Sequence, residues 1–327
     1  MTQVCIGIDF GGTGIKYTAL DEANTHREIY SVPTPVADGK DAILKQIVTG
    51  CEDYIKRLGL SRDDVLRIGI GSPGPLSVDR GIILALPNIP NMKNVPIKSI
   101  IEEATGIPTT LENDANAASY AEFLCGAGAE VSNMVMLTLG TGVGSGIIIG
   151  GSLVHGAHDM GGELGHLIVD PGGRLCSCGQ KGCLEEYSSA GAMGRYATKA
   201  LRAGEGSDSL LQTVLAEKGS IDALDIENAM LAGDAFAKVR WDEFCHFLAI
   251  GCVNIIRMLD PDRIVLSGGI TKAGDTLYTP LMEQFRAMDW TLLETQTDIA
   301  IAQLGSDAGA VGAAGVAWYD VKNQKGA

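Results

Sequence analysis

Three cysteines and one histidine stand within eighteen residues of the sequence, from His166 to Cys183. With Cys176 and Cys178 between them, they offer three thiolates and one imidazole. Four such ligands complete the tetrahedral coordination of Zn²⁺, and a zinc ion with no open position has a structural role. The pattern therefore predicts a structural zinc site that keeps the surrounding loop rigid. The other cysteines stand singly in apolar stretches and are expected in the core: Cys5, Cys51, Cys125, Cys245 and Cys252.

Two glycine turns, each carrying a threonine, join pairs of apolar segments. They are Gly11-Gly12-Thr13-Gly14 and Gly140-Thr141-Gly142-Val143-Gly144, and a further pair, Gly268-Gly269, follows the apolar segment 263–267. Backbone N–H groups in such turns form a concavity that accepts phosphate oxygens without a lysine. Either turn alone could be a plain tight hairpin, but together they favour a phosphate site. The P-loop and dinucleotide-binding fingerprints are both missing from the sequence, which weighs against those two folds.

Two aspartates stand where they could act on a phosphoryl group. Asp9 closes an apolar segment beside the first glycine turn, where a lone carboxylate needs a cation, so we expect it to order Mg²⁺ through water. Asp114 follows Asn113 at the expected start of a helix, where the helix dipole should favour its ionised form. It could accept a hydroxyl proton during phosphoryl transfer, although local sequence alone favours a simple helix-capping role.

The composition narrows the possible partners and location. The 327-residue chain has 40 acidic and 25 basic residues, and its formal net charge of −15 weighs against nucleic acid and anionic membrane as partners. Its 43 glycines are typical of a chain with many tight turns. The first residues carry no basic region, and no apolar run approaches the ~20 residues of a membrane span. We therefore expect a cytoplasmic protein.

Apolar periodicity predicts an α/β fold with two domains. Strands are expected at residues 4–9, 15–20, 27–32, 65–71, 108–112, 134–139, 145–149 and 263–267, and helices at 41–58, 97–104, 115–125, 234–259 and 308–319. The order of apolar segment, glycine turn and apolar segment occurs twice, once in each expected domain. We place an N-terminal domain at 1–112, joined by a C-terminal helix at about 308–327, and a larger domain with the zinc-binding loop at 113–307.

These motifs resemble those of the ROK family, which comprises sugar kinases and sugar-responsive repressors. The resemblance covers essentially the whole chain. It is carried by Asp9-x-Gly11-Gly12-Thr13, Leu139-Gly140-Thr141-Gly142-x-Gly144, Ser267-Gly268-Gly269, and Glu163-Leu-Gly165-His166 followed by Cys176-x-Cys178-Gly-x-x-Gly182-Cys183-Leu-Glu185. It implies the actin-like ATPase (ribonuclease H-like) fold, with two α/β domains and a sugar and nucleotide cleft between them.

The resemblance also implies a reaction and a set of site residues. The expected reaction is transfer of a phosphoryl group from ATP to the 6-hydroxyl of a hexose, glucose first, with Asp114 as general base. Residues expected at the nucleotide and its Mg²⁺ are Asp9, Gly11, Gly12, Thr13, Gly140, Thr141, Gly142, Gly144, Gly268 and Gly269. Residues expected at the sugar are Gly74, Asn88, Asn113, Asp114, Glu163, His166 and Glu185. His166 would serve twice, with one ring nitrogen on zinc and the other toward the sugar.

Several alternatives remain open. Many ROK kinases have Gly-Trp after the Pro-Asn pair, whereas this chain continues with Asn91-Met92, so N-acetylmannosamine, fructose and allose stay candidate substrates. Residues 11–16 also resemble those of polyphosphate-using glucokinases, although ATP is the favoured donor. A sugar-sensing regulator would carry a helix-turn-helix domain, for which a first strand beginning by Val4 leaves no room. A homodimer or homotetramer is expected, and His155 and His158 are expected to be solvent-exposed rather than metal ligands.

Overall fold

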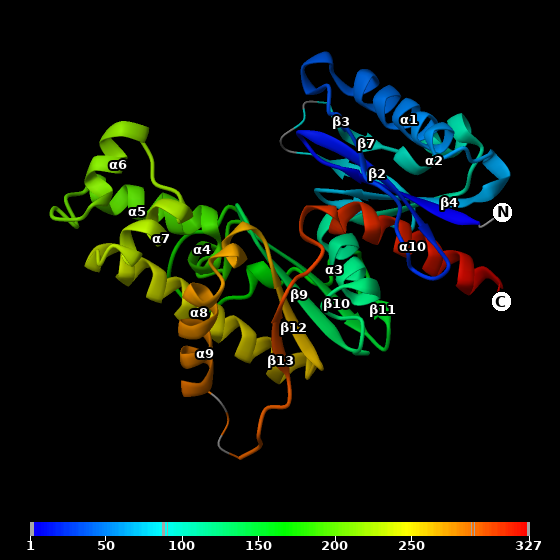
Figure 1. The fold of residues 1–327 in the computed structure, drawn as a ribbon. Helices are drawn as coiled ribbons and strands as arrows, with labels where there is room; N and C mark the ends of the chain where they lie inside the picture. The colour runs from blue at the N-terminus through cyan, green and yellow to red at the C-terminus, as the bar shows by residue number, and fades with distance from the viewer. Residues whose placement is uncertain (1–2, 87–88, 90, 289, 291, 326–327) are drawn as a thin grey trace. The chain divides into compact units, whose positions relative to one another are not determined.

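The computed structural model describes residues 3–86, 89, 91–288, 290 and 292–325. The chain forms an α/β fold in which residue contacts define two compact units (Figure 1). Unit 1 consists of Met1–Ser132, Gly146–Gly162 and Ala302–Ala327, and unit 2 of Asn133–Ser145 and Glu163–Ile301. None of the described helices combines the length and the apolar character that a membrane crossing requires.

Unit 1 is built on a five-stranded mixed sheet in the order β3-β2-β1-β4-β8. Strand β1 pairs antiparallel with β2 and parallel with β4, and β4 pairs parallel with β8. These strands are β1 (Val4–Phe10), β2 (Gly14–Asp21), β3 (Tyr30–Pro33), β4 (Val65–Ser72) and β8 (Thr109–Asn113). A small antiparallel sheet contains β5 (Leu76–Ser77), β6 (Ile82–Ala85) and β7 (Lys93–Val95). Strand β10 (Val143–Ile149) begins in unit 2 and ends in unit 1, where it pairs antiparallel with β11 (Ser152–Leu153), and the second five-stranded sheet has the order β11-β10-β9-β12-β13.

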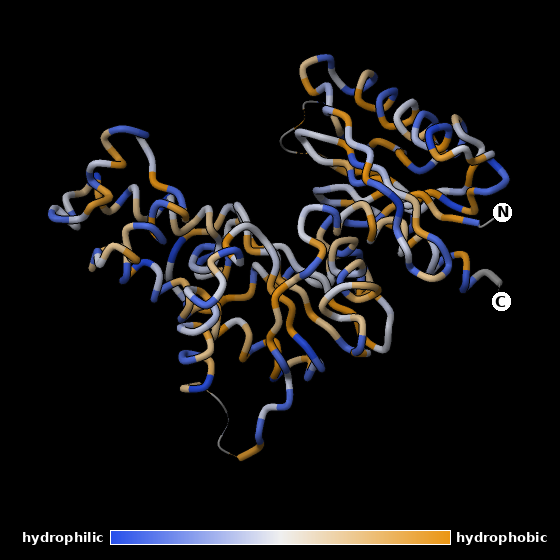
Figure 2. Tube along the Cα trace, in the orientation of Figure 1, coloured by the Kyte–Doolittle hydropathy of each residue, from blue (hydrophilic) through white to orange (hydrophobic). Residues whose placement is uncertain are grey.

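Helices cover both faces of the five-stranded sheet of unit 1. Figure 1 shows α1 (Lys40–Arg57) and α2 (Ile97–Thr105) over one face, and α3 (Asp114–Cys125) with α10 (Ala308–Lys325) over the other. Hydropathy alternates along α1 (Figure 2), as expected for a helix that buries Ile43, Ile47 and Cys51 against the strands.

Unit 2 contains a parallel sheet of β9 (Met134–Leu139), β12 (Arg263–Ser267) and β13 (Asp298–Ile301). Its helices are α4 (Glu185–Ser188), α5 (Ala190–Arg202), α6 (Leu211–Lys218), α7 (Ala223–Leu231), α8 (Ala235–Leu259) and α9 (Asp275–Ala287). The predicted helices at 41–58 and 234–259 and the predicted strands at 134–139 and 263–267 are confirmed within one residue at each end. Strands β5, β6, β7, β11 and β13 are too short or too irregular in pattern for the sequence to have predicted them.

Helix α10 packs unusually close to its neighbours in unit 1. A Cβ atom at Gly7 of β1 or Gly69 of β4 would lie under 3.0 Å from a backbone carbonyl oxygen of α10. A Cβ at Gly312 of α10 would overlap the carbonyl of Ala117 in α3 in the same way. Because side chains are missing at these three positions, the backbone of α10 lies directly between the sheet and α3.

The predicted domain boundary at Asn113 is not where the contacts divide the chain. Helix α3 belongs to unit 1, because it packs against α10, and residues 146–162 also return to that unit. The sequence prediction placed the boundary at the end of β8 because the contact between α3 and α10 joins residues almost 200 positions apart. The C-terminal helix does lie in the same unit as the N-terminal strands.

We predict that Gly312→Ala destabilises the protein, although alanine is ordinarily the better helix former by about 1 kcal/mol. The added methyl group would overlap the Ala117 carbonyl, and relieving that overlap should cost about 2 kcal/mol or more. Thermal unfolding should show a Tm lower by several degrees. Asn323→Ala, at an exposed position of the same helix, is the control and should leave Tm within about one degree. An unchanged Tm for Gly312→Ala would refute the close packing.

Candidate active site

The first glycine turn begins two residues after Asp9, at the end of β1. Gly11 N–H donates to the carbonyl of Gly14 at 3.0 Å, and the Thr34 hydroxyl donates to the carbonyl of Gly11 at 2.7 Å. These bonds fix the turn, and Asp9 pairs across the hairpin with Lys16. The Lys16 ammonium lies 3.7 Å from Asp307 and also donates to the Ser306 carbonyl. The turn is therefore a rigid hairpin with a carboxylate at its base.

Asp9 and Asp114 influence each other electrostatically in unit 1. Burial raises the pKa of Asp9 to about 6, Lys16 opposes the rise, and the Asp114 carboxylate adds to it. A Cβ on Gly309, at the start of α10, would lie 2.7 Å from the Asp9 carboxyl carbon, so glycine leaves the space that this carboxylate occupies. A buried carboxylate with a raised pKa is an oxygen ligand whose ionised form a cation would stabilise.

Asp114 is the first residue of α3, and the neighbouring Asn113 caps that helix. The Asn113 side-chain oxygen accepts hydrogen bonds from the N–H groups of Ala115 at 2.9 Å and Asn116 at 3.2 Å. Burial raises the pKa of Asp114, and the N–H of Ala115, 2.8 Å from its Oδ1, only partly offsets that rise. The expectation that the helix start would favour the ionised form is therefore wrong in direction, because burial outweighs the helix N–H groups.

The second glycine turn, between β9 and β10, is bonded to Glu185 within unit 2. The Val143 N–H donates to Glu185 Oε2 at 3.0 Å, and the same oxygen occupies the space that a side chain at Gly142 would need. Gly191, at the start of α5, donates from its N–H to the Gly140 carbonyl at 3.1 Å. Glu185, which we expect to contact the sugar, therefore also fixes the second glycine turn.

At three glycines of the predicted phosphate site, neither contacts within the chain nor backbone conformation requires glycine. A Cβ atom at Gly12, Gly140 or Gly269 would meet no protein atom within 4 Å, and none of the three has a positive φ. Free space above the backbone is what an approaching phosphate group would require. Gly268 differs, because its φ of 107° and its contact with the carbonyl of Leu139 explain the glycine by themselves.

The four predicted metal ligands come together in unit 2. The ligand atoms of His166, Cys176, Cys178 and Cys183 all lie within 4.8 Å of one another. Cys178 Sγ lies 3.6 Å from Cys183 Sγ, and Cys176 Sγ lies 3.7 Å from His166 Nδ1. Tetrahedral ligands at zinc distances have sulfur–sulfur separations of about 3.8 Å and sulfur–nitrogen separations of about 3.6 Å. The residues fit a metal ion of that geometry, with Nδ1 of His166 facing the sulfur atoms.

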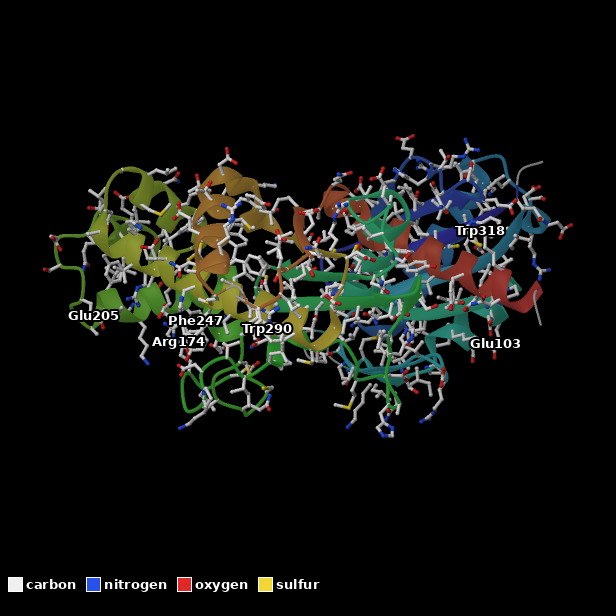
Figure 3. All side chains as sticks on the ribbon, turned by 90° about the horizontal axis from the view of Figure 1, so that it is seen from below. Glu103, Arg174, Glu205, Phe247, Trp290 and Trp318 are labelled. Carbon is white, nitrogen blue, oxygen red and sulfur yellow. The ribbon has the colours of Figure 1, made fainter. Side chains whose placement is uncertain are left out.

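The loop that carries these ligands is anchored to the helices of unit 2. The Arg174 guanidinium lies over the rings of Tyr187 and Tyr196, at 4.5 and 4.0 Å from their centroids, and donates to Glu243 at 2.7 Å. Tyr187 packs on Phe247 of α8 with ring centroids 4.0 Å apart. Figure 3 shows Arg174 and Phe247 close together on the same side of this unit. The ligand loop is thus held by aromatic and charged contacts as well as by its own turns.

Comparison with known proteins decides the family. The ROK family profile matches residues 5–319. The chain belongs to the ROK family. A glucokinase of Halalkalibacterium halodurans is 37% identical over 308 residues, which cover 94% of this chain and 92% of that protein.

Two solved ROK structures resemble the chain over nearly its full length. The ROK hexokinase from Thermus thermophilus is 34% identical, with a TM-score of 0.87, and the match covers 98% of this chain and all of that one. A ROK family glucokinase from Streptomyces griseus, determined in complex with glucose and AMPPNP, is 33% identical with a TM-score of 0.77, covering 97% and 99% of the two chains. The predicted actin-like ATPase fold of ROK sugar kinases is confirmed.

The remaining residues predicted from the ROK resemblance are distributed over both units. Gly74 lies in unit 1, where its φ of 91° accounts for the glycine, and Asn88 lies outside the described residues. Glu163 is exposed in unit 2, immediately before the 3₁₀ turn Leu164–His166 that is bonded to Ser145. Gly144 lies within β10. Their contacts with a sugar or nucleotide stay predictions.

Two features of this ROK protein were missed or misjudged from the sequence. A cavity of about 540 Å³ lies along α5, and its lining includes Gly191, Arg195, Lys199 and Arg202. The spacing of these three basic residues along one helix face was the available signal. His158 is exposed as expected, but His155 is half-buried and bonded to Glu112, so its predicted exposure was wrong.

We predict that Asp9→Asn stabilises this protein at neutral pH in Mg²⁺-free buffer. Burial raises the pKa of Asp9 from 3.8 to about 6, so the folded state binds the extra proton and wild-type stability falls as pH rises through that window. The free energy of unfolding of the variant does not fall in this way. It should exceed that of wild type by about 1–3 kcal/mol above pH 6 and equal it below pH 4. Chemical denaturation at several pH values measures it, with the exposed Asp41→Asn in α1 as control. Equal stability of Asp9→Asn and wild type at pH 7.5 would contradict the assignment.

Proposed function

We propose that this chain transfers the γ-phosphoryl group of ATP to the 6-hydroxyl of a hexose, and that glucose is its substrate. The observation that carries the proposal is the half-buried Asp114 carboxylate at the start of α3, with its raised pKa and with Asn113 beside it. The glucokinases among its relatives, one of them solved with glucose and AMPPNP, support the same substrates.

The roles of the residues follow from what phosphoryl transfer requires. The protein has to align the sugar hydroxyl with the γ-phosphate and to balance the developing charge. Asp114 accepts the hydroxyl proton, and because burial raises its pKa, its carboxylate is a better base. Asp9 would hold Mg²⁺, which neutralises phosphate charge, and the N–H groups of the glycine turns would bind phosphate oxygens. Asn113 would donate to or accept from a sugar hydroxyl next to the reacting one.

Unit 2 would supply the remaining substrate contacts. The open space over Gly140 and Gly269 fits phosphate groups, and the cavity along α5 begins at Gly191, which is bonded to Gly140. We assign that cavity to the nucleoside part of ATP. Glu163, His166 and Glu185 would bind sugar hydroxyls, because paired carboxylate and imidazole groups distinguish hexoses by their hydroxyl pattern.

The four-ligand cluster would hold a structural Zn²⁺. Its chemistry would be to fix the ligand loop, leaving the second ring nitrogen of His166 for a sugar hydroxyl. A homodimer or homotetramer also remains a prediction, which light scattering at several protein concentrations would test.

An ADP-release assay tests the proposed reaction directly. The sugars are glucose, fructose, mannose, N-acetylmannosamine, N-acetylglucosamine and allose, with ATP and polyphosphate as alternative donors. Glucose with ATP should give the highest kcat/KM. The hexose assignment fails if another sugar exceeds glucose by tenfold or more, and the kinase proposal fails if no pair is turned over.

Asp114→Asn should lower kcat by at least about 10³-fold, because the amide cannot accept the hydroxyl proton. Binding of glucose measured by calorimetry should change little, and the thermal unfolding midpoint should not fall, because a neutral amide escapes the burial cost that raises the pKa of Asp114. Asp41→Asn, which also replaces an aspartate in the first turn of a helix of unit 1, should retain full activity. Substantial kcat in Asp114→Asn would show that another group takes the proton.

Metal analysis by mass spectrometry should find about one zinc per chain. Cys178→Ser should release it and raise KM for glucose by roughly tenfold or more, since the loop carrying His166 would lose its fixed geometry. Cys125→Ser, at a half-buried cysteine of α3 outside the cluster, is the matched control and should keep the metal. A metal-free wild type with full activity would refute the structural role.

A further inference from the structure

A buried ion pair lies beside the proposed base but outside the residues assigned so far. Glu112 Oε2 lies 2.7 Å from His155 Nε2, and the Glu112 side chain is only 2% exposed. A carboxylate this deeply buried is costly unless donors surround it, and the histidine is one such partner. Both residues belong to unit 1.

The second oxygen of Glu112 is bonded to the start of α3. Glu112 Oε1 accepts from the Asn113 N–H at 2.8 Å and from the Asn116 side-chain amide at 2.9 Å. Asn113 in turn caps the helix whose first residue is Asp114. The orientation of the Glu112 carboxylate therefore determines where the backbone on both sides of Asp114 can lie.

His155 is the first residue of a short segment, residues 155–161, whose two ends are joined by a hydrogen bond. The Gly161 N–H donates to the His155 carbonyl at 2.7 Å, which closes the segment. Asp159 Oδ2 accepts from the Val78 N–H at 3.0 Å, which gives the segment a second anchor in unit 1. The chain continues from this segment into Glu163, a residue proposed to bind the sugar.

We propose that the His155–Glu112 ion pair is a positioning device for the phosphoryl-transfer reaction. The imidazolium of His155 holds the Glu112 carboxylate in the orientation that fixes the start of α3, and it ties segment 155–161 to the same carboxylate. Neither residue touches the reacting atoms, so both are positioning residues. The kinetic part of this inference rests on the proposed function, whereas the physical coupling of the two segments does not.

The charges around His155 favour its protonated form. Hydrogen bonding to Glu112 raises the pKa of His155, burial opposes the rise, and the charges of Glu112, Asp159 and Asp79 add to it. Other polar groups that line the same cavity of about 490 Å³ are Lys98, Thr110, Tyr120, Tyr319 and Asp320. Because the pKa is raised, the ion pair is complete below the ordinary histidine pKa of about 6.5 and is lost as pH rises through the higher folded value.

Breaking the pair should affect the chemical step more than nucleotide binding. A shift of a catalytic group by about 1 Å can cost roughly 10²-fold in rate. We expect His155→Gln, which retains a neutral donor, to lower kcat about 10- to 100-fold at pH 7 while KM for ATP stays within about twofold. His155→Arg keeps a permanent charge, so it should retain more activity than His155→Gln and should not lose kcat at alkaline pH.

The experiment measures kcat and KM from pH 6 to 9.5 for wild type, His155→Gln, His155→Arg and His158→Gln. The last is the matched control, because His158 is an exposed histidine in the same segment. Wild type and His158→Gln should lose kcat together at alkaline pH, and neither His155 variant should show that loss. If His155→Gln does not fold, His155→Arg still tests the proposal. A kcat that stays constant at alkaline pH supports it, and a loss of kcat like that of wild type contradicts it.

Hydrogen exchange measured by mass spectrometry tests the coupling without any substrate. Amides of both 113–116 and 155–161 should exchange faster in His155→Gln than in His158→Gln, and in wild type they should lose protection together as pH rises, after correction for intrinsic rates. Faster exchange with no turnover of any sugar by wild type would leave the coupling standing and refute the proposed function. An active kinase in which His155→Gln matches His158→Gln in pH profile and in exchange would overturn the inference.

Discussion

Helix α10 can lie between the sheet of unit 1 and helix α3 only because the facing positions lack side chains. Gly7 and Gly69 let the sheet approach the helix on one side, and Gly312 lets α3 approach it on the other. This packing brings the last helix of the chain against its first strand and against α3, so the end of β1 and the start of α3 lie within one unit. Asp9 and Asp114 occupy those two points, and their electrostatic coupling is a consequence of the same close packing.

Unit 2 achieves rigidity by a different route. Four ligands would hold its ligand loop through a metal ion, and Arg174 of the same loop stacks on Tyr187 and Tyr196 as additional support. Glu185 connects this loop to the second glycine turn through the Val143 N–H. The proposed sugar-binding and phosphate-binding parts of unit 2 therefore share the Glu185 side chain, and a structural change in either part should alter the other.

The sequence was sufficient wherever local pattern decides structure, and insufficient wherever burial or a distant partner does. Dense spacing of soft ligands predicted the cluster at His166, and a helix-capping asparagine predicted the start of α3. The pKa direction of Asp114 could not be predicted, because it depends on burial by elements far away in the chain. The sequence predicts an exposed His155, because its partner, Glu112, lies 43 positions earlier and no local pattern indicates the contact.

We propose that the carboxylates of unit 1 direct a phosphoryl group to the 6-hydroxyl of a hexose. The most direct measurement is NMR of the product formed from ATP and uniformly ¹³C-labelled glucose by the wild-type enzyme. We expect a phosphomonoester whose phosphorus couples to C6, formed in equal amount to ADP. A phosphate on C1, or free phosphate with unmodified glucose, would contradict it.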